Sequence, residues 1–77
     1  MENTFLIDLS VKFGLDDTKL SKTADICYQL GYYEISSREF QRAATYMCTM
    51  KILDLPAEEL IEEMRRKGFD GENAPTE

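Results

Sequence analysis

Residues 27–40 read CYQLGYYEISSREF, and this stretch carries a helix end and a helix start a few residues apart. Gly31 followed by Tyr32 is typical of a helix C-terminus. There the glycine takes the left-handed conformation and the next apolar side chain folds back onto the helix. Ser36 and Glu39 have the spacing of a capping box, which marks the start of a new helix. The stretch therefore predicts a corner between two helices.

The same helix-stop signal, a glycine followed by a large apolar residue, occurs twice more, at Gly14-Leu15 and Gly68-Phe69. Each pair follows a segment that could form a helix. Pro56 suits the first turn of a helix because its missing N–H would be unpaired there anyway. We therefore expect an all-α fold, a small bundle of three to four short helices. Their expected ranges are about 4–13, 18–30, 36–53 and 56–67.

The N-terminal segment permits a second interpretation, because apolar residues occupy alternate positions from Phe5 to Phe13. Strict alternation is the pattern of a half-buried β-strand. A lone strand needs a partner strand, and no other segment of the chain has strand character. The stop signal at Gly14 favours a helix, so we expect a helix, with a strand that pairs with a second copy of the chain as the alternative.

The length of 77 residues is enough for one domain, which we place at residues 1–69. Residues 70–77 are polar and contain glycine and proline, and we expect them to form a disordered acidic tail. The chain has 9 basic and 15 acidic residues, a net charge of −6, and residues 54–77 hold 8 of the acids and 3 of the bases. This balance disfavours general binding to nucleic acid or to an anionic membrane surface.

The composition also excludes several kinds of catalytic site. The chain contains no histidine, so it cannot form a Ser/His/Asp or Cys/His arrangement. Cys27 and Cys48 are too few for a structural zinc site and lie too far apart in sequence for a C-x-x-C motif. We expect two reduced, partly buried thiols, no metal, no cofactor and no enzymatic activity. The chain has neither a secretory signal pattern nor an apolar run long enough for a membrane span, so we expect a cytoplasmic protein.

Tyrosine, methionine and glutamate residues provide the candidate interaction surface. A tyrosine beside an acidic residue, as at Tyr33-Glu34, is an effective binding anchor, since it gives a large contact area and a polar tip. Methionine is common at adaptable interfaces. Glutamates early in the last predicted helix would steer a basic partner. The candidate partner-binding residues are Tyr33, Tyr46, Met47, Met50, Glu58, Glu59, Glu62 and Glu63.

These features favour a small acidic interaction module that masks a basic surface of another protein, as an inhibitor, an adaptor or an antitoxin-like regulator. The segment from Tyr46 to Leu53 is apolar on most sides. A chain this short has little core to cover such a segment, so we also expect a homodimer through this segment. The first predicted helix is a candidate second contact.

The alternative function is that of a helix-turn-helix transcriptional regulator. Four polar residues share one face of the third predicted helix: Ser37, Arg38, Gln41 and Arg42. Arginine and glutamine are side chains that recognise guanine and adenine edges in the major groove of DNA. Only under this alternative do we expect nucleic acid as a partner.

Overall fold

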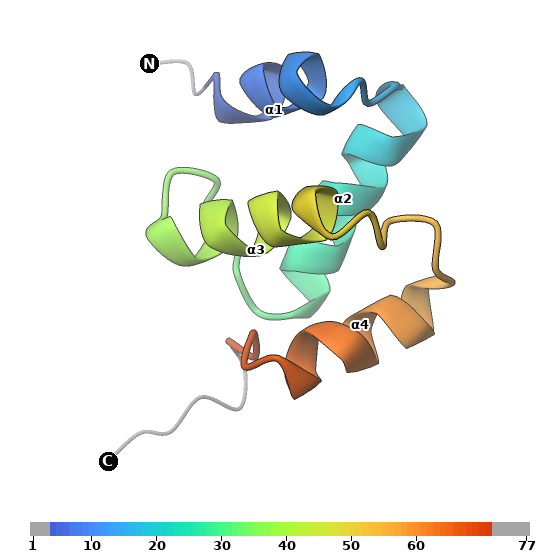
Figure 1. The fold of residues 1–77 in the computed structure, drawn as a ribbon. Coiled ribbons are helices and arrows are strands. Elements are labelled where there is room, and N and C mark those ends of the chain that lie inside the picture. Colours follow the sequence, from blue (N-terminus) through green and yellow to red (C-terminus); the bar gives the residue numbers. More distant parts are fainter. Residues whose placement is uncertain (1–3, 72–77) are drawn as a thin grey trace.

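The computed structural model describes residues 4–71 and folds them into four α-helices (Figure 1). The helices are α1 (Phe5–Phe13), α2 (Asp17–Gln29), α3 (Arg38–Thr49) and α4 (Ala57–Arg66). No strand occurs within residues 4–71. The all-α prediction is therefore confirmed, and residues 5–13 form a helix and not a strand.

The four helices form a flat molecule whose Cα atoms extend over 37 × 31 × 16 Å. Helix α2 packs against α3 and α4, and α1 packs against α3. In Figure 1, α1, α3 and α4 lie one below the other, and α2 runs across them. The core takes side chains from every helix: Leu9, Ile26, Cys27, Leu30, Phe40, Ala43, Ala44, Met47, Cys48, Leu53, Leu60 and Met64.

The same type of backbone hydrogen bond closes the end of each of the four helices. Just beyond each helix, one N–H group donates to the carbonyl five residues earlier, at 2.9 to 3.2 Å. These bonds are Leu15 to Ser10, Tyr32 to Cys27, Ile52 to Met47 and Phe69 to Met64. The residue before each donor has a positive φ: Gly14, Gly31, Lys51 and Gly68. The three predicted helix stops are thus confirmed, and a fourth occurs at a lysine.

Helix α3 ends at Thr49, earlier than the predicted end at Leu53. The sequence shows no stop signal here, because Lys51 adopts the left-handed conformation (φ 57°) that glycine adopts elsewhere. The chain then turns, and Leu53 is buried in the core. From α2, the ammonium group of Lys22 holds this turn by donating to the carbonyls of Leu53 and Leu55, at 2.5 and 2.6 Å.

The start of α3 also differs from the prediction. The N-cap is Ser37, whose hydroxyl accepts a hydrogen bond from the Phe40 N–H at 3.2 Å and donates to the Glu34 carbonyl at 2.8 Å. The expected cap, Ser36, is exposed. Two adjacent serines offer two possible caps, and the second is selected because its hydroxyl closes the preceding turn as well as the helix. Glu39 therefore lies in the first turn of α3 without the predicted capping partner.

The chain beyond α4 returns to the α2–α3 corner. The Arg65 guanidinium lies 3.6 Å from the Asp70 carboxylate, and the Gly71 N–H donates to the Leu30 carbonyl at 2.7 Å. A Cβ atom at Gly71 would lie 2.9 Å from that carbonyl oxygen and 2.9 Å from the Tyr32 ring, so only glycine fits. Asp70 and Gly71, the first two residues of the predicted tail, thus belong to the fold. Residues 72–77 lie outside the described residues.

Candidate functional site

The α2–α3 corner contains an open hollow of about 450 Å³. We call it the tyrosine hollow, and its lining residues are Gly31, Tyr32, Tyr33, Glu34, Ser37, Glu39 and Gly71. The helix stop at Gly31 folds the Tyr32 side chain back against the core. The next residue, Tyr33, points outward, with 65% of its surface exposed. The helix stop therefore places one tyrosine in the wall of the hollow and the other at its rim.

Acidic groups surround the phenol at the wall of the tyrosine hollow. Burial raises the pKa of Tyr32, and the nearby carboxylates of Asp70 and Glu39 raise it further, while a hydrogen bond with the backbone of Asp70 and the charge of Arg42 lower it. Glu34 and Glu39 are both exposed lining residues. The hollow thus combines aromatic surface with several carboxylates, and this combination attracts a cation.

Sequence reasoning identified Tyr33 and its neighbour Glu34 but missed most of this hollow. The local pattern indicates only that Tyr32 follows a helix stop and that Glu39 belongs to a capping box. Gly71 was assigned to the tail. The corner predicted between two helices was the available signal, since residues on both sides of a tight corner must lie close together.

The glutamates of α4 face solvent as predicted, with one exception. Glu58, Glu59 and Glu62 are exposed. Glu63 is half-buried and forms an ion pair with Arg66. The first three therefore form the acidic face of α4, and the negative charge of Glu63 is largely compensated.

The predicted apolar anchors have three different environments. Tyr46 is half-buried, and its ring centroid lies 5.2 Å from that of Phe69. Met47 is fully buried in the core, because α3 turns this side toward α2, and it is not available to a partner. Met50 is 52% exposed at the end of α3. Of the three, only Met50 presents a mainly free surface.

The polar side of α3 lines a shallow groove of about 410 Å³, which we call the α3 groove. Its lining residues are Phe5, Arg38, Gln41, Arg42, Thr45, Tyr46 and Phe69. The Gln41 amide donates to the Ile35 carbonyl at 3.0 Å, and the Arg42 guanidinium lies over the Phe69 ring, 5.6 Å from its centroid. Ser37 is engaged as the α3 cap. Three of the four candidate DNA-binding residues thus contact their own protein, and Arg38 remains exposed.

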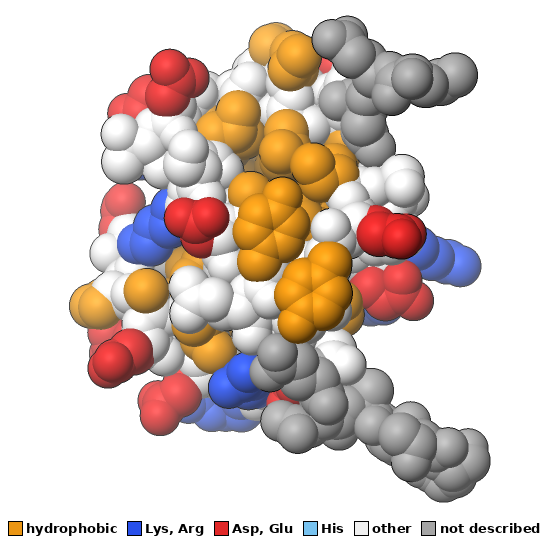
Figure 2. All heavy atoms as spheres, turned by 180° about the vertical axis from the view of Figure 1, so that it is seen from behind, with side chains coloured by type: hydrophobic (Ala, Val, Ile, Leu, Met, Phe, Trp, Pro, Cys, Tyr) orange, Lys and Arg blue, Asp and Glu red, His pale blue; other side chains and the backbone are white. Residues whose placement is uncertain are grey.

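Seen from behind the view of Figure 1, the molecule shows a patch of apolar side chains with charged residues around it (Figure 2). An aromatic row joins α1, α2 and α3: the centroid of the Phe40 ring lies 6.5 Å from that of Phe5 and 6.0 Å from that of Tyr28. Tyr28 is exposed and was not among the predicted candidates. Apolar patches with a polar surround commonly mark protein interaction sites.

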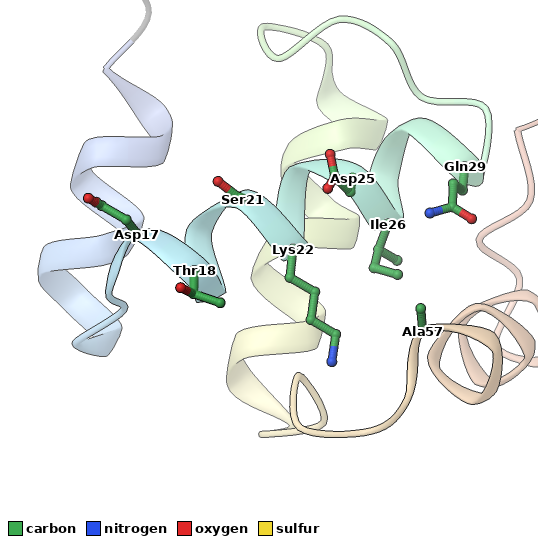
Figure 3. Close-up of a pocket in the computed structure, with 8 residues that line it drawn as sticks. All are labelled: Asp17, Thr18, Ser21, Lys22, Asp25, Ile26, Gln29 and Ala57. Carbon is green, nitrogen blue, oxygen red and sulfur yellow. The ribbon is translucent and has the colours of Figure 1, made fainter.

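A further hollow lies between α2 and the start of α4 (Figure 3). Lys22 and Ile26 point toward the α3–α4 turn and Ala57, whereas Asp25 points to the other side of α2. The Lys22 ammonium group is occupied by two carbonyls. Lys22 and Asp25 therefore do not form an acid–base pair, and the role of Lys22 is to hold the turn.

Both cysteines are free thiols, and they are more deeply buried than the sequence predicted, since they belong to the core. Burial raises the pKa of Cys27 to about 12, with nearby Cys48 as the second cause, and burial also raises the pKa of Cys48. Neutral buried thiols are poor nucleophiles. Among residues 4–71, no group of three or more acidic or cysteine side chains is arranged to hold a metal ion. No described helix is long and apolar enough to span a membrane.

Comparisons with protein-family models, curated proteins and solved structures find no match to this chain.

Proposed function

We propose that this protein is an acidic interaction module that binds a basic surface of another protein. The observation that carries the proposal is the tyrosine hollow, in which two tyrosines and two glutamates meet at one corner. A lysine or arginine side chain of the partner fits this chemistry. Its aliphatic stem would pack on the tyrosine rings, and its charge would lie beside the carboxylates of Glu34 and Glu39.

The acidic face of α4 supports the same kind of partner. Glu58, Glu59 and Glu62 are exposed, and the chain has a net charge of −6. The negative electrostatic potential of these charges accelerates the encounter with a basic protein. It adds little to the strength of the final contact. In the proposed mechanism, α4 steers the partner and Tyr33 anchors it. Met50 adds exposed apolar contact area at the end of α3.

The proposed biological role is that of an inhibitor, an adaptor or an antitoxin-like regulator in the cytoplasm. By covering a basic surface, the module would block whatever that surface binds, including a nucleic acid. A homodimer is also part of this proposal.

The second candidate function is DNA recognition through α3. It is favoured by the α3 groove, which brings together Arg38, Gln41 and Arg42. The contacts of Gln41 and Arg42 within the protein, together with the acidic net charge, favour the first proposal.

A fluorescent peptide of alternating lysine, arginine and leucine residues tests the first proposal, with a DNA duplex as the second probe. Tyr33→Ala is expected to weaken peptide binding by roughly tenfold, mainly through faster dissociation, because an anchor that becomes buried in the complex acts after the encounter. The double variant Glu34→Gln/Glu39→Gln should weaken binding as well. Asp25→Asn, which removes an exposed carboxylate elsewhere on α2, is the matched control and should bind normally.

Charge reversal of the three exposed α4 glutamates should slow peptide association and reduce its salt dependence, with little change in dissociation. Binding to the DNA duplex is the outcome that would contradict the first proposal. Sequence-specific duplex binding that disappears in Arg38→Ala/Arg42→Ala, while the Tyr33 and Glu34 variants behave normally, would establish the second function instead.

A further inference from the structure

The outer surface of α1 is apolar although α1 already buries its opposite side. Ile7 and Val11 lie one helical turn apart on this outer surface and are 59% and 78% exposed. Leu9 on the inner side is buried, with Phe5 and Phe13 packed against the core. A helix that is apolar on both sides is normally covered on both sides. Figure 1 shows α1 at an edge of the molecule, where a second protein can reach it.

A polar row runs beside the exposed apolar residues. Successive residues of an α-helix are rotated by about 100° about the helix axis, so Asp8 and Lys12 lie next to Ile7 and Val11 on the outer surface. Both Asp8 and Lys12 are exposed. Within residues 4–71, neither forms an ion pair, and the Lys12 ammonium lies 5.6 Å from the centroid of the Phe13 ring. The outer surface of α1 thus carries one acid and one base in sequence order along a single row.

This arrangement is self-complementary, and we propose that α1 binds α1 of a second copy of the chain in an antiparallel, two-fold symmetric contact. The two-fold axis would run perpendicular to both helices. It keeps the polar row on the same side in both copies and reverses its direction. Asp8 of each copy then lies near Lys12 of the other, and Ile7 and Val11 of the two copies cover one another.

A parallel contact would not use these charges, because its two-fold axis would place the two polar rows on opposite sides of the interface. A basic or an acidic partner protein would satisfy only one of the two charges. The second copy satisfies both, and this complementarity identifies it as the occupant. Two helices of nine residues make a small contact, so the dimer should be weak and should depend on concentration.

This inference names the contact of the homodimer in the proposed function. It is independent of the proposed binding to a basic partner, since it uses no residue of the tyrosine hollow or of the acidic face of α4. Self-association is therefore expected to survive Tyr33→Ala, and binding of the basic peptide is expected to survive Val11→Asp. Failure of one proposal leaves the other measurable.

Sedimentation equilibrium over a wide concentration range tests the contact. The wild-type mass should rise toward twice the monomer mass, and Val11→Asp should stay monomeric. Asp8→Lys and Lys12→Asp should each weaken self-association, because each places like charges opposite one another. An equimolar mixture of these two variants should recover a dimer, since both cross pairs are then of opposite charge. Asp25→Lys makes the same charge change on α2 and should leave the dimer intact.

Circular dichroism of each variant provides the folding control, because Asp8 and Lys12 also complement the α1 dipole. A wild-type protein that stays monomeric throughout would overturn the proposal. It would also be overturned by a dimer that persists in folded Val11→Asp, or by two charge variants that fail to associate when mixed.

Discussion

Lys51 has the left-handed backbone conformation that glycine has at the ends of the other three helices. A side chain in this conformation costs about 1 kcal/mol relative to glycine, and the cost is partly offset by the greater freedom of glycine in the unfolded chain. We therefore expect Lys51→Gly to raise the free energy of unfolding by about 0.5 kcal/mol. Urea unfolding of both proteins measures the change. A lower stability of the variant would mean that the lysine side chain itself stabilises the turn.

The buried thiol of Cys27 makes stability depend on alkaline pH. Its pKa is raised from the ordinary value of 9.0 to about 12, chiefly by burial. The folded protein therefore retains a proton that the unfolded chain releases, and this contribution is complete below about pH 9. Above that pH, the free energy of unfolding should fall by up to ~1.4 kcal/mol per pH unit.

Urea unfolding at pH values from about 7 to about 11 measures this slope. Cys27→Ala should reduce it without abolishing it, because the pKa values of Tyr32 and Cys48 are raised as well. An unchanged slope in Cys27→Ala would contradict the assignment.

At the scale of the helices, the start of α3 distinguishes two adjacent serines. Ser37→Ala removes the hydroxyl that accepts the Phe40 N–H, and should lower the free energy of unfolding by about 1 kcal/mol. Ser36→Ala is the matched control, and since Ser36 is exposed, it should have little effect. Equal losses in the two variants, measured by urea unfolding, would show that the capping role is shared.

The helices themselves were predictable from sequence wherever a special residue marks their ends. Gly14, Gly31 and Gly68 predicted three helix ends correctly because glycine is favoured at a positive φ. The end at Lys51 was not predictable, since lysine carries no such signal and tertiary contacts determine that turn. The wrong cap at Ser36 arose because either serine fits the local pattern, and only the contact of the second with Glu34 decides between them.

For the candidate sites, the sequence predicted which residues are exposed better than it predicted which residues lie next to one another in the fold. Tyr33 and the exposed α4 glutamates lie at the surface as expected. Met47 was misplaced, because helical spacing alone does not tell which side of an apolar helix is covered. The contribution of Gly71 to the tyrosine hollow depends on the chain returning from α4 to α2, a long-range contact that no local pattern reveals.

At the scale of the whole molecule, four surfaces are candidates for binding. The tyrosine hollow and the acidic face of α4 are proposed for a basic partner, and the outer surface of α1 for a second copy. The α3 groove contains arginines whose neighbours are aromatic. These surfaces are formed by different residues, so variants in one should leave the others functional.

The most direct test of the central claim is a nuclear magnetic resonance titration of the wild-type protein with the basic peptide. Amide shifts should change at the tyrosine hollow, most strongly at Tyr33, Glu34 and Gly71, and in Glu34→Gln/Glu39→Gln these changes should require a higher peptide concentration. Changes confined to Gln41, Arg42 and Thr45 of the α3 groove, or none at all in the hollow, would contradict the proposal that this corner binds basic side chains.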